Sequence, residues 1–370
     1  MTKKRKILFY QDQTLDFFVE GGIPLGGSAI ESFVWMKSLH ELGFKVYQFQ
    51  KSSDNRILKN DMLWINIVKT YDDRIRRKWY WYWYRLPIVF FVLLRYRFDY
   101  LYTAIPTWET YYYGRLCKIL GIKHIVRIAS DNITSRRDGI NQAEIDLIFK
   151  GISSADVISV QNVFQQKSIK KRIPSSNVVL IYNPIVIDKF FFKPKDKMGG
   201  YIAWVANFRD VKNMALLYEI ASKLPSDRFK IAGQPLIPLE PETEDSLKKL
   251  KTLCNVDFLG RIEQSEILSF YRGAKFLLNT SKFEGFSNTF LEAMITGTPI
   301  LTTPKVNPDE IISKFDLGVI YSNAEDLTAY LANLSESAYL QKSVNCVKYV
   351  GTKHDHIALG KKLIDIISEK

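Results

Sequence analysis

Two glutamates eight positions apart, Glu284 and Glu292, are the residues of this chain whose type and spacing best suit a chemical role. They lie in NTSKFEGFSNTFLEAMITGTPILTT (279–303), which is typical of a strand end, a glycine-containing loop and a helix with Ser287 as its N-cap. The first backbone N–H groups of such a helix favour a phosphate. Carboxylates are poor phosphate ligands but good acceptors for sugar hydroxyls. The pattern therefore predicts a site for sugar groups on either side of a diphosphate.

These residues need a scaffold, and the chain alternates between short strand patterns and helical patterns. The expected strands lie at 6–10, 45–50, 62–68, 99–105, 124–130, 156–161, 178–183, 201–207, 229–233, 256–260, 276–280 and 299–303. In one intervening helix, 28–43, an apolar face ends at Gly43. Such alternation predicts parallel sheets with helices on both faces and ligands beyond the carboxyl ends of the strands. The expected fold class is α/β, with two Rossmann-like, doubly wound domains facing across a cleft.

A charged segment punctuated by Pro and Gly, KFFFKPKDKMGG (189–200), is expected to link two domains. The predicted division is an N-terminal Rossmann-like domain at 1–190 and a C-terminal Rossmann-like domain at 191–353. A helix at 354–370 would follow and could pack back on the first domain.

Composition narrows the class of protein. With 46% hydrophobic and 25% charged residues the chain is expected to be globular. Residues 1–190 hold 29 Lys and Arg against 17 Asp and Glu, whereas the rest is nearly balanced, so the first half is expected to meet something anionic. Three cysteines without a CxxC motif and a four-residue apolar stretch near the start argue for a cytoplasmic protein without a zinc site. No metal ligands are expected.

The segment around the two glutamates resembles the E-x7-E signature of retaining glycosyltransferases of family 4, which have the two-domain GT-B fold. Four other stretches resemble the same family in the same order. They are GGIPLGGSAIESFVWMKSLHELGFKVY, ADVISVQNVFQQKSI…NVVLIYNPIVIDKF, WVANFRDVKN and VDFLGRIEQSEILSFYRGAKFLLNTSKFEGF. Together they cover most of the chain.

The resemblance implies that the domain at 1–190 binds the acceptor and that the domain at 191–353 binds the nucleotide sugar. It also implies a role for each matching residue in the second domain. Glu292 would bind the ribose hydroxyls of a nucleotide, and Glu284 would bind hydroxyls of the donor sugar. Arg209 and Lys212 would neutralise the leaving diphosphate, so that no divalent metal is needed. The family usually has a Gly-Arg pair with a Lys five positions beyond the Arg, whereas here Asn207 stands at that distance before Lys212.

The remaining implied donor contacts come from three loops. Gly26 and Gly27 would let the backbone of the first domain approach the phosphates. Arg261 would border the nucleobase. The loop and helix start between the two glutamates would also contact the donor, through Gly285, Phe286, Ser287, Asn288 and Thr289.

On the acceptor side the sequence departs from the family, which commonly has a His after its fifth strand. Here Ser130, Asp131 and Asn132 follow that strand. Asp131 is the candidate to meet the acceptor hydroxyl as a weak base, with Arg127 orienting it. A turn or helix-cap role for Asp131 is the alternative.

The resemblance implies a retaining, metal-independent enzyme of the hexosyltransferase type that needs no cofactor. Its donor would be a nucleotide diphosphate sugar, and a UDP-sugar is the first expectation. Its acceptor would be a hydroxyl of a glycan, a lipid-linked glycan, or a cell-wall or surface polysaccharide. A GT-B-fold epimerase or phosphorylase and a non-catalytic partner subunit are the alternatives. The glycine pairs match neither GxGxxG nor a Walker loop, and no nucleic-acid-binding signature is visible.

Basic and aromatic residues interleave at 74–97, in KWYWYWYRLPIVFFVLLRYR and the residues before it. Its longest aliphatic piece, LPIVFFVLL, is about half the length of a membrane span. Two interpretations remain open: a helix buried behind the sheet, or a patch on the cytoplasmic face of an anionic membrane.

Overall fold

The computed structural model describes residues 4–23, 26–75, 81–129 and 141–369. The chain divides into two compact units, residues 1–184 with 356–370 (unit 1) and residues 185–355 (unit 2). The chain leaves unit 1 after residue 184, slightly before the domain boundary expected at residue 190. It re-enters unit 1 after residue 355, just beyond the boundary expected at residue 353.

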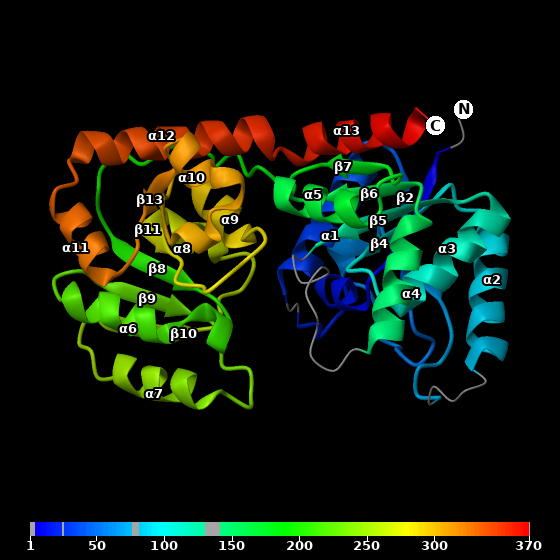
Figure 1. The fold of residues 1–370 in the computed structure, drawn as a ribbon, viewed down its shortest axis with the longest axis horizontal. Helices are drawn as coiled ribbons and strands as arrows, with labels where there is room; N and C mark the ends of the chain where they lie inside the picture. The colour runs from blue at the N-terminus through cyan, green and yellow to red at the C-terminus, as the bar shows by residue number, and fades with distance from the viewer. Residues whose placement is uncertain (1–3, 24–25, 76–80, 130–140, 370) are drawn as a thin grey trace. The chain divides into compact units, whose positions relative to one another are not determined.

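Unit 1 contains a seven-stranded, wholly parallel sheet in the order β3-β2-β1-β4-β5-β6-β7 (Figure 1). Its strands are β1 Lys6–Tyr10, β2 Lys45–Gln50, β3 Asn66–Lys69, β4 Tyr100–Ala104, β5 Lys123–Ile128, β6 Val157–Val160 and β7 Val178–Leu180. The central strand β1 pairs on both sides, with Ile7 opposite Val46 of β2 and Tyr100 of β4. This order places β1 and β4 at the switch point of a doubly wound sheet, where ligands bind beyond the strand ends.

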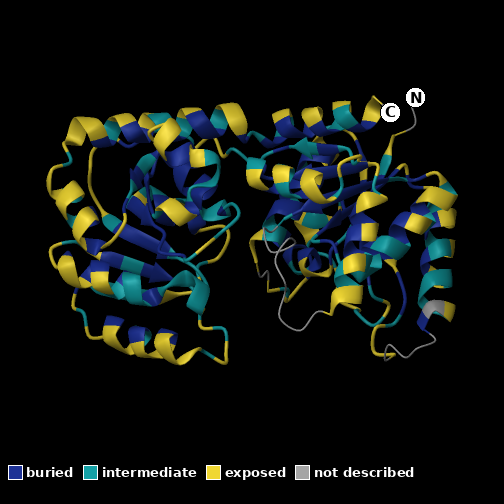
Figure 2. Cartoon of the chain, viewed as in Figure 1, coloured by how far each residue is buried: buried dark blue, intermediate teal, exposed yellow. Residues whose placement is uncertain are grey.

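Helices cover both faces of this sheet because successive strand residues point to opposite sides. Ile7 and Phe9 belong to a core with α1 (Gly27–Glu41) and α13 (His356–Ser368), whereas Leu8 belongs to the core on the α2 and α3 side. The other helices of unit 1 are α2 Arg85–Tyr96, α3 Trp108–Leu120, α4 Gln142–Ser153 and α5 Val163–Arg172. The strands are buried and the outer helix faces are exposed (Figure 2).

The last helix, α13, packs closely on α1. A Cβ on Gly360 would lie 2.1 Å from Ser38 Oγ, so the two helices approach nearer than any other residue would allow. Ser38 Oγ also donates to the His356 carbonyl at 2.6 Å. Unit 1 is therefore built from both ends of the chain.

Unit 2 contains a six-stranded parallel sheet in the order β10-β9-β8-β11-β12-β13. Its strands are β8 Tyr201–Val205, β9 Phe229–Ala232, β10 Val256–Gly260, β11 Ala274–Leu278, β12 Ile300–Thr302 and β13 Gly318–Ile320. Its helices are α6 Met214–Lys223, α7 Pro241–Leu250, α8 Ile267–Gly273, α9 Asn288–Ile295, α10 Ile311–Lys314, α11 Ala324–Ala332 and α12 Glu336–Lys353. Here the switch point lies between β8 and β11.

The structure confirms the predicted α/β class with two Rossmann-like sheets. Strands β1, β2 and β10 begin and end as predicted. The strand expected at 62–68 was placed too early, because 60–62 forms a turn of 3₁₀ helix, and β13 was not predicted. Over the residues that the structure describes, no helix is long and apolar enough to span a bilayer.

Candidate functional site

The loops that follow β8 and β11 meet at the carboxyl edge of the unit 2 sheet. Trp204 Nε1 donates to Thr280 Oγ1 at 3.0 Å, and Thr280 Oγ1 donates to the Lys212 carbonyl at 2.7 Å. The Lys282 N–H donates to the Val211 carbonyl at 2.8 Å. Because β8 and β11 are neighbours in the sheet, these bonds fix the basic loop of residues 209–213 against the loop of residues 279–287.

The contact between these two loops brings two of the predicted site residues together. Lys212 Nζ lies 2.5 Å from Glu284 Oε1. The same oxygen accepts from Ser281 Oγ at 2.6 Å and from Asn279 Nδ2 at 3.2 Å. The Glu284 side chain is 14% exposed, so one edge of a largely buried carboxylate remains open to solvent. Neither Ser281 nor Asn279 was singled out from the sequence, although both lie within the signature segment.

The surroundings keep Glu284 ionised. Burial alone would raise the pKa of its carboxyl, but the Lys212 ammonium and the hydroxyls of Ser281 and Ser287 outweigh burial and lower the pKa below its usual value. A carboxylate held in one orientation by three donors is prepared to accept hydrogen bonds from a ligand.

Two further cations, Arg209 in the basic loop and Lys282 in the loop of residues 279–287, have different environments. Arg209 precedes a turn of 3₁₀ helix at Asp210–Lys212, is exposed, and forms no ion pair with another described residue. Asp210 pairs with Lys282, whose Nζ lies 2.5 Å from its Oδ1. Lys282 is a third cation at this edge that the sequence analysis missed, and its position in the signature loop was the available signal.

Glu292 lies on α9 and is 7% exposed. Its Oε1 accepts from Gln264 Nε2 at 3.3 Å. Burial raises the pKa of Glu292 to about 7, and the Gln264 hydrogen bond opposes this only in part. The two glutamates thus lie at the same sheet edge with pKa values shifted in opposite directions.

Between them, α9 begins at Asn288 with Ser287 as its N-cap, as the sequence predicts. The Ser287 hydroxyl does not cap the helix, however; it forms a hydrogen bond of 2.8 Å with the Thr289 hydroxyl. The first turn contains no acidic residue. Phe286 packs on the His354 ring, with ring centroids 5.4 Å apart.

Strands β9 and β10 end beside this edge. Gly233 has φ 139°, and a Cβ there would lie 1.9 Å from the Ala206 carbonyl, so only glycine fits between the loops after β8 and β9. Its N–H donates to the Gly260 carbonyl at 2.8 Å. Arg261 directly follows Gly260 and is exposed. It lies at the carboxyl end of β10, which is the edge strand of this sheet.

In unit 1 the predicted glycines start α1. Gly26 is the N-cap with φ 88°, and Gly27 is the first helical residue; both are exposed. Gln11, which follows β1, donates to Ser28 Oγ at 3.1 Å and accepts from Ser32 Oγ at 2.5 Å. The sequence analysis did not identify Gln11, which fixes the start of α1 to the carboxyl end of the central strand.

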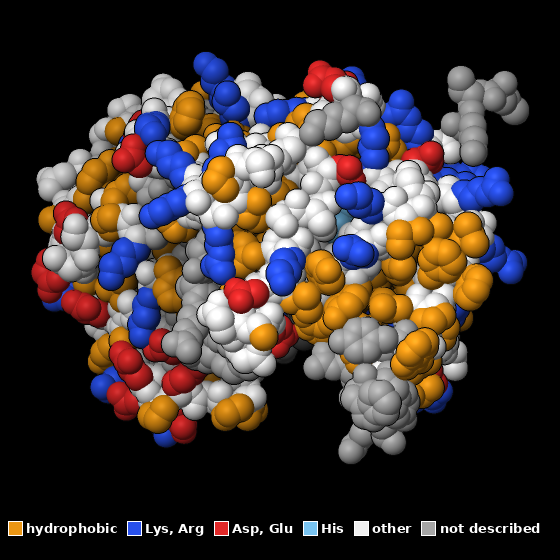
Figure 3. All heavy atoms as spheres, turned by 45° about the vertical axis from the view of Figure 1, so that its right-hand side comes forward, with side chains coloured by type: hydrophobic (Ala, Val, Ile, Leu, Met, Phe, Trp, Pro, Cys, Tyr) orange, Lys and Arg blue, Asp and Glu red, His pale blue; other side chains and the backbone are white. Residues whose placement is uncertain are grey.

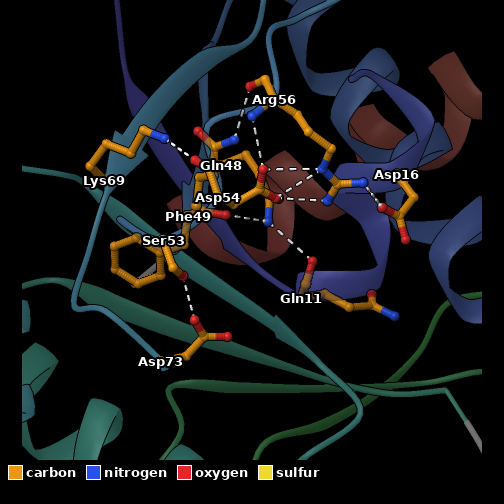
Figure 4. Close-up of polar contacts among 10 residues, drawn as sticks. Gln11, Asp16, Gln48, Phe49, Ser53, Asp54, Arg56, Lys69 and Asp73 are labelled. Atoms are coloured by element: carbon orange, nitrogen blue, oxygen red, sulfur yellow. Dashed lines mark hydrogen bonds and ion pairs between the residues drawn. The ribbon is translucent and has the colours of Figure 1, made fainter. Parts of the chain in front are cut away.

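The loops after β1, β2 and β3 are also joined by polar contacts (Figure 4). Gln48 Nε2 donates to the Gln11 carbonyl at 3.1 Å. The Arg56 guanidinium donates to both carboxylate oxygens of Asp54 and also to Asp16 Oδ1, the latter at 2.7 Å. The charges of Arg56, Asp54 and Asp16 pair with one another, so this part of the edge stabilises the loops rather than presenting free charge.

Arg127 proves to have a structural role. Its side chain is fully buried, and Nε lies 2.7 Å from Glu31 Oε1 on α1. Among the described residues, the other guanidinium hydrogen bonds go to Ser159, to the carbonyls of Val160 and Ile181, and to Asn183. Through these bonds Arg127 holds α1 to the ends of β6 and β7, and its expected role in orienting Asp131 stays a prediction. Asp131 lies outside the described residues, as do all of 130–140.

Comparisons with known proteins agree with this geometry. Residues 186–351, which include both glutamates and the basic loop, match the family "Glycosyl transferases group 1". The chain is 26% identical over 156 residues to "Glycosyltransferase 1 domain-containing protein 1" of Xenopus tropicalis, covering 40% of this chain and 45% of that protein. The chain thus spans less than half the length of this relative.

Solved structures share the whole fold. A sucrose-phosphate synthase from Thermosynechococcus elongatus superposes with a TM-score of 0.76 at 15% identity, covering 99% of each chain. Anabaena Alr3699/HepE, solved in complex with UDP, superposes with a TM-score of 0.74 at 12% identity, covering 100% of each chain. Residues 186–351 thus match the group 1 glycosyltransferase family, within a chain that has the α/β fold with two Rossmann-like sheets seen in its GT-B structural neighbours.

Proposed function

We propose that this protein is a retaining glycosyltransferase that moves a sugar from a nucleotide diphosphate sugar to an acceptor hydroxyl. The observation that carries the proposal is the contact of Lys212 with Glu284, 2.5 Å apart at the carboxyl edge of the unit 2 sheet. A cation, an oriented carboxylate and the start of α9 share one loop system there. These are the groups that a diphosphate joined to a sugar requires.

In the proposed donor complex, Glu292 accepts hydrogen bonds from the ribose hydroxyls and Glu284 from hydroxyls of the transferred sugar. A UDP-sugar is the proposed donor, since the fold neighbour from Anabaena was solved with UDP. Arg261, after β10, would border the base. Because ribose hydroxyls donate to the ionised form of a carboxylate, donor binding would lower the pKa of Glu292 from about 7 and release a proton.

During transfer the bond between the anomeric carbon and the diphosphate oxygen breaks, and the oxygen leaves with the electron pair. The acceptor hydroxyl oxygen forms the new bond on the same face of the sugar, and its proton passes to the carboxylate of Asp131, the proposed weak base. Arg209, Lys212 and the N–H groups at the start of α9 would stabilise the charge that develops on the diphosphate. The proposed reaction needs no divalent metal.

Lys212 has two partners in this scheme. Without a ligand it rests on Glu284, and with the donor bound it would also face the diphosphate. Arg209, exposed and without an ion pair among the described residues, would supply the second positive charge. Unit 1 would contribute Gly26 and Gly27 near the phosphates and would bind the acceptor, a glycan or lipid-linked glycan, with Asp131 as the proposed weak base.

The function is tested with a panel of UDP-, GDP- and ADP-sugars, read by thermal stabilisation and by donor turnover with a matching panel of acceptors. Stabilisation by one nucleotide class together with a transferred sugar of retained configuration is the expected result. An epimerised nucleotide sugar formed without acceptor, or phosphate-dependent release of the sugar, would replace transfer by the epimerase or phosphorylase reaction. Binding without any turnover would indicate a non-catalytic subunit.

A further inference from the structure

We propose that the outward face of α2 in unit 1 docks this protein on an anionic lipid bilayer. The proposal rests on unit 1 alone and does not depend on the proposed sugar transfer. The helix has the sequence RLPIVFFVLLRY, so it is apolar almost throughout, yet within it only Val89 and Leu93 are buried. The other apolar side chains of α2 are partly or largely exposed to solvent.

The inward attachment of this segment is well defined. Val89 and Leu93 pack in the core beside Leu8 and Leu101 of the sheet. Before the helix, Trp81 is buried and its ring lies 4.8 Å from that of Trp108. These contacts fix which side of α2 faces away from the sheet.

The outward side carries large apolar side chains. Ile88 is 38% exposed, Phe91 64% and Leu94 46%, and Trp83 just before the helix is 80% exposed. Residues three or four positions apart share one face of a helix, so Ile88 and Phe91 are neighbours. A shallow open groove of about 560 Å³ follows this face, lined chiefly by Trp83, Tyr84, Pro87, Ile88, Phe91 and Val92. Figure 3 shows hydrophobic side chains gathered over this region of unit 1.

Exposed cations lie on α2 and on the neighbouring helix α3. Arg95 lines the groove, Arg97 follows the helix, and Arg115 and Lys118 are exposed on α3, which packs beside α2. Across the described part of the chain, none of the four forms an ion pair. The nearby exposed acid, Asp99, accepts a hydrogen bond from the backbone N–H of Lys6. Charge complementarity therefore favours an anionic partner.

A lipid surface fits this combination better than a protein does. Trp and Tyr rings settle at the level of lipid headgroups, apolar side chains enter the acyl boundary, and basic residues attract anionic lipids. A second copy of this chain in a two-fold contact would instead bring the same four cations together from both sides, and these like charges would repel one another. The helix would lie in the plane of the interface.

The test is flotation of the full chain with vesicles of phosphatidylcholine alone and of phosphatidylcholine mixed with phosphatidylglycerol. The wild-type protein should bind the mixed vesicles and bind them less at high salt. The combined variant Ile88→Gln, Phe91→Gln and Leu94→Gln should lower this binding by at least about tenfold, because exposed apolar side chains then no longer enter the bilayer. The combined variant Arg95→Gln, Arg115→Gln and Lys118→Gln should lower it by about fivefold for each cation removed.

A matched control replaces exposed residues on a helix of unit 2, Val344→Gln with Lys348→Gln on α12, and should bind as the wild type does. All the substituted side chains are solvent-exposed, so thermal unfolding should be unchanged. Equal binding by wild type and the apolar variant would overturn the proposal, as would equal binding to both kinds of vesicle. A dimer in sedimentation that the apolar variant dissociates would also overturn it, in favour of a second copy.

Discussion

At the scale of single residues, the candidate site contains two carboxylates whose pKa values are shifted in opposite directions. Glu284 is held ionised by Lys212, whereas Glu292 is buried beside Gln264 and has a pKa raised to about 7. The E-x7-E spacing predicted both positions. It could not predict their electrostatic states, because these depend on Lys212 and Gln264, which come from other loops.

Glu292 leads to a prediction about pH. Its pKa is raised in the folded protein from about 4.5 to about 7, so folding takes up a proton between these values and the free energy of unfolding falls as pH rises from about 4.5 to 7. Glu292→Gln should remove this fall and stabilise the ligand-free protein at pH 8 by up to about 3 kcal/mol, while weakening nucleotide binding. Urea unfolding across this pH range measures the effect.

The exposed Glu263 on the same loop as Gln264 supplies the control, since Glu263→Gln should leave both the pH profile and nucleotide affinity unchanged. A Glu292→Gln protein that is no more stable than the wild type at pH 8 would show that Glu292 is not buried as a carboxyl in solution.

At the scale of elements, strand positions followed from short β-branched and aromatic runs, and the parallel sheets followed from their alternation with helices. The errors have physical causes. The strand expected at 62–68 begins with Met62, the last residue of a 3₁₀ turn, and the chain turns again before β3 starts at Asn66. β13 is a three-residue edge strand containing Gly318. Contacts such as that of Gly233 with Ala206 depend on the distance between two loops, which no sequence pattern encodes.

Gly233 provides the test at this scale. Gly233→Ala should lower stability by about 2 kcal/mol or more and displace the loop that carries Lys212, because the new Cβ would meet the Ala206 carbonyl. Gly260→Ala is the matched control: it also has a positive φ, 69°, but nothing lies within 4 Å of its added Cβ, so only the backbone strain of about 1 kcal/mol is expected. Thermal unfolding compares the two, and equal losses would contradict the close approach.

At the scale of the whole molecule, the chain forms unit 1, then unit 2, and returns to unit 1 with α13. Leu363→Ala should therefore destabilise unit 1 by about 2 to 5 kcal/mol, because this side chain is 1% exposed in the core with α1. Hydrogen exchange should accelerate in β1 and α1 and stay unchanged in β8 and β11. The exposed Lys361→Ala on the same helix should have little effect. Loss of protection in both units together would contradict the division.

The most direct measurement of the central claim is Glu284→Gln, assayed for sugar transfer and, in parallel, for binding of the nucleoside diphosphate. The account predicts that transfer falls by about a thousandfold, because the oriented carboxylate that positions the sugar is lost. Nucleotide affinity should change by less than about threefold, because Glu292 and the start of α9 remain. Transfer at the wild-type rate would contradict the assignment of this edge as the catalytic site.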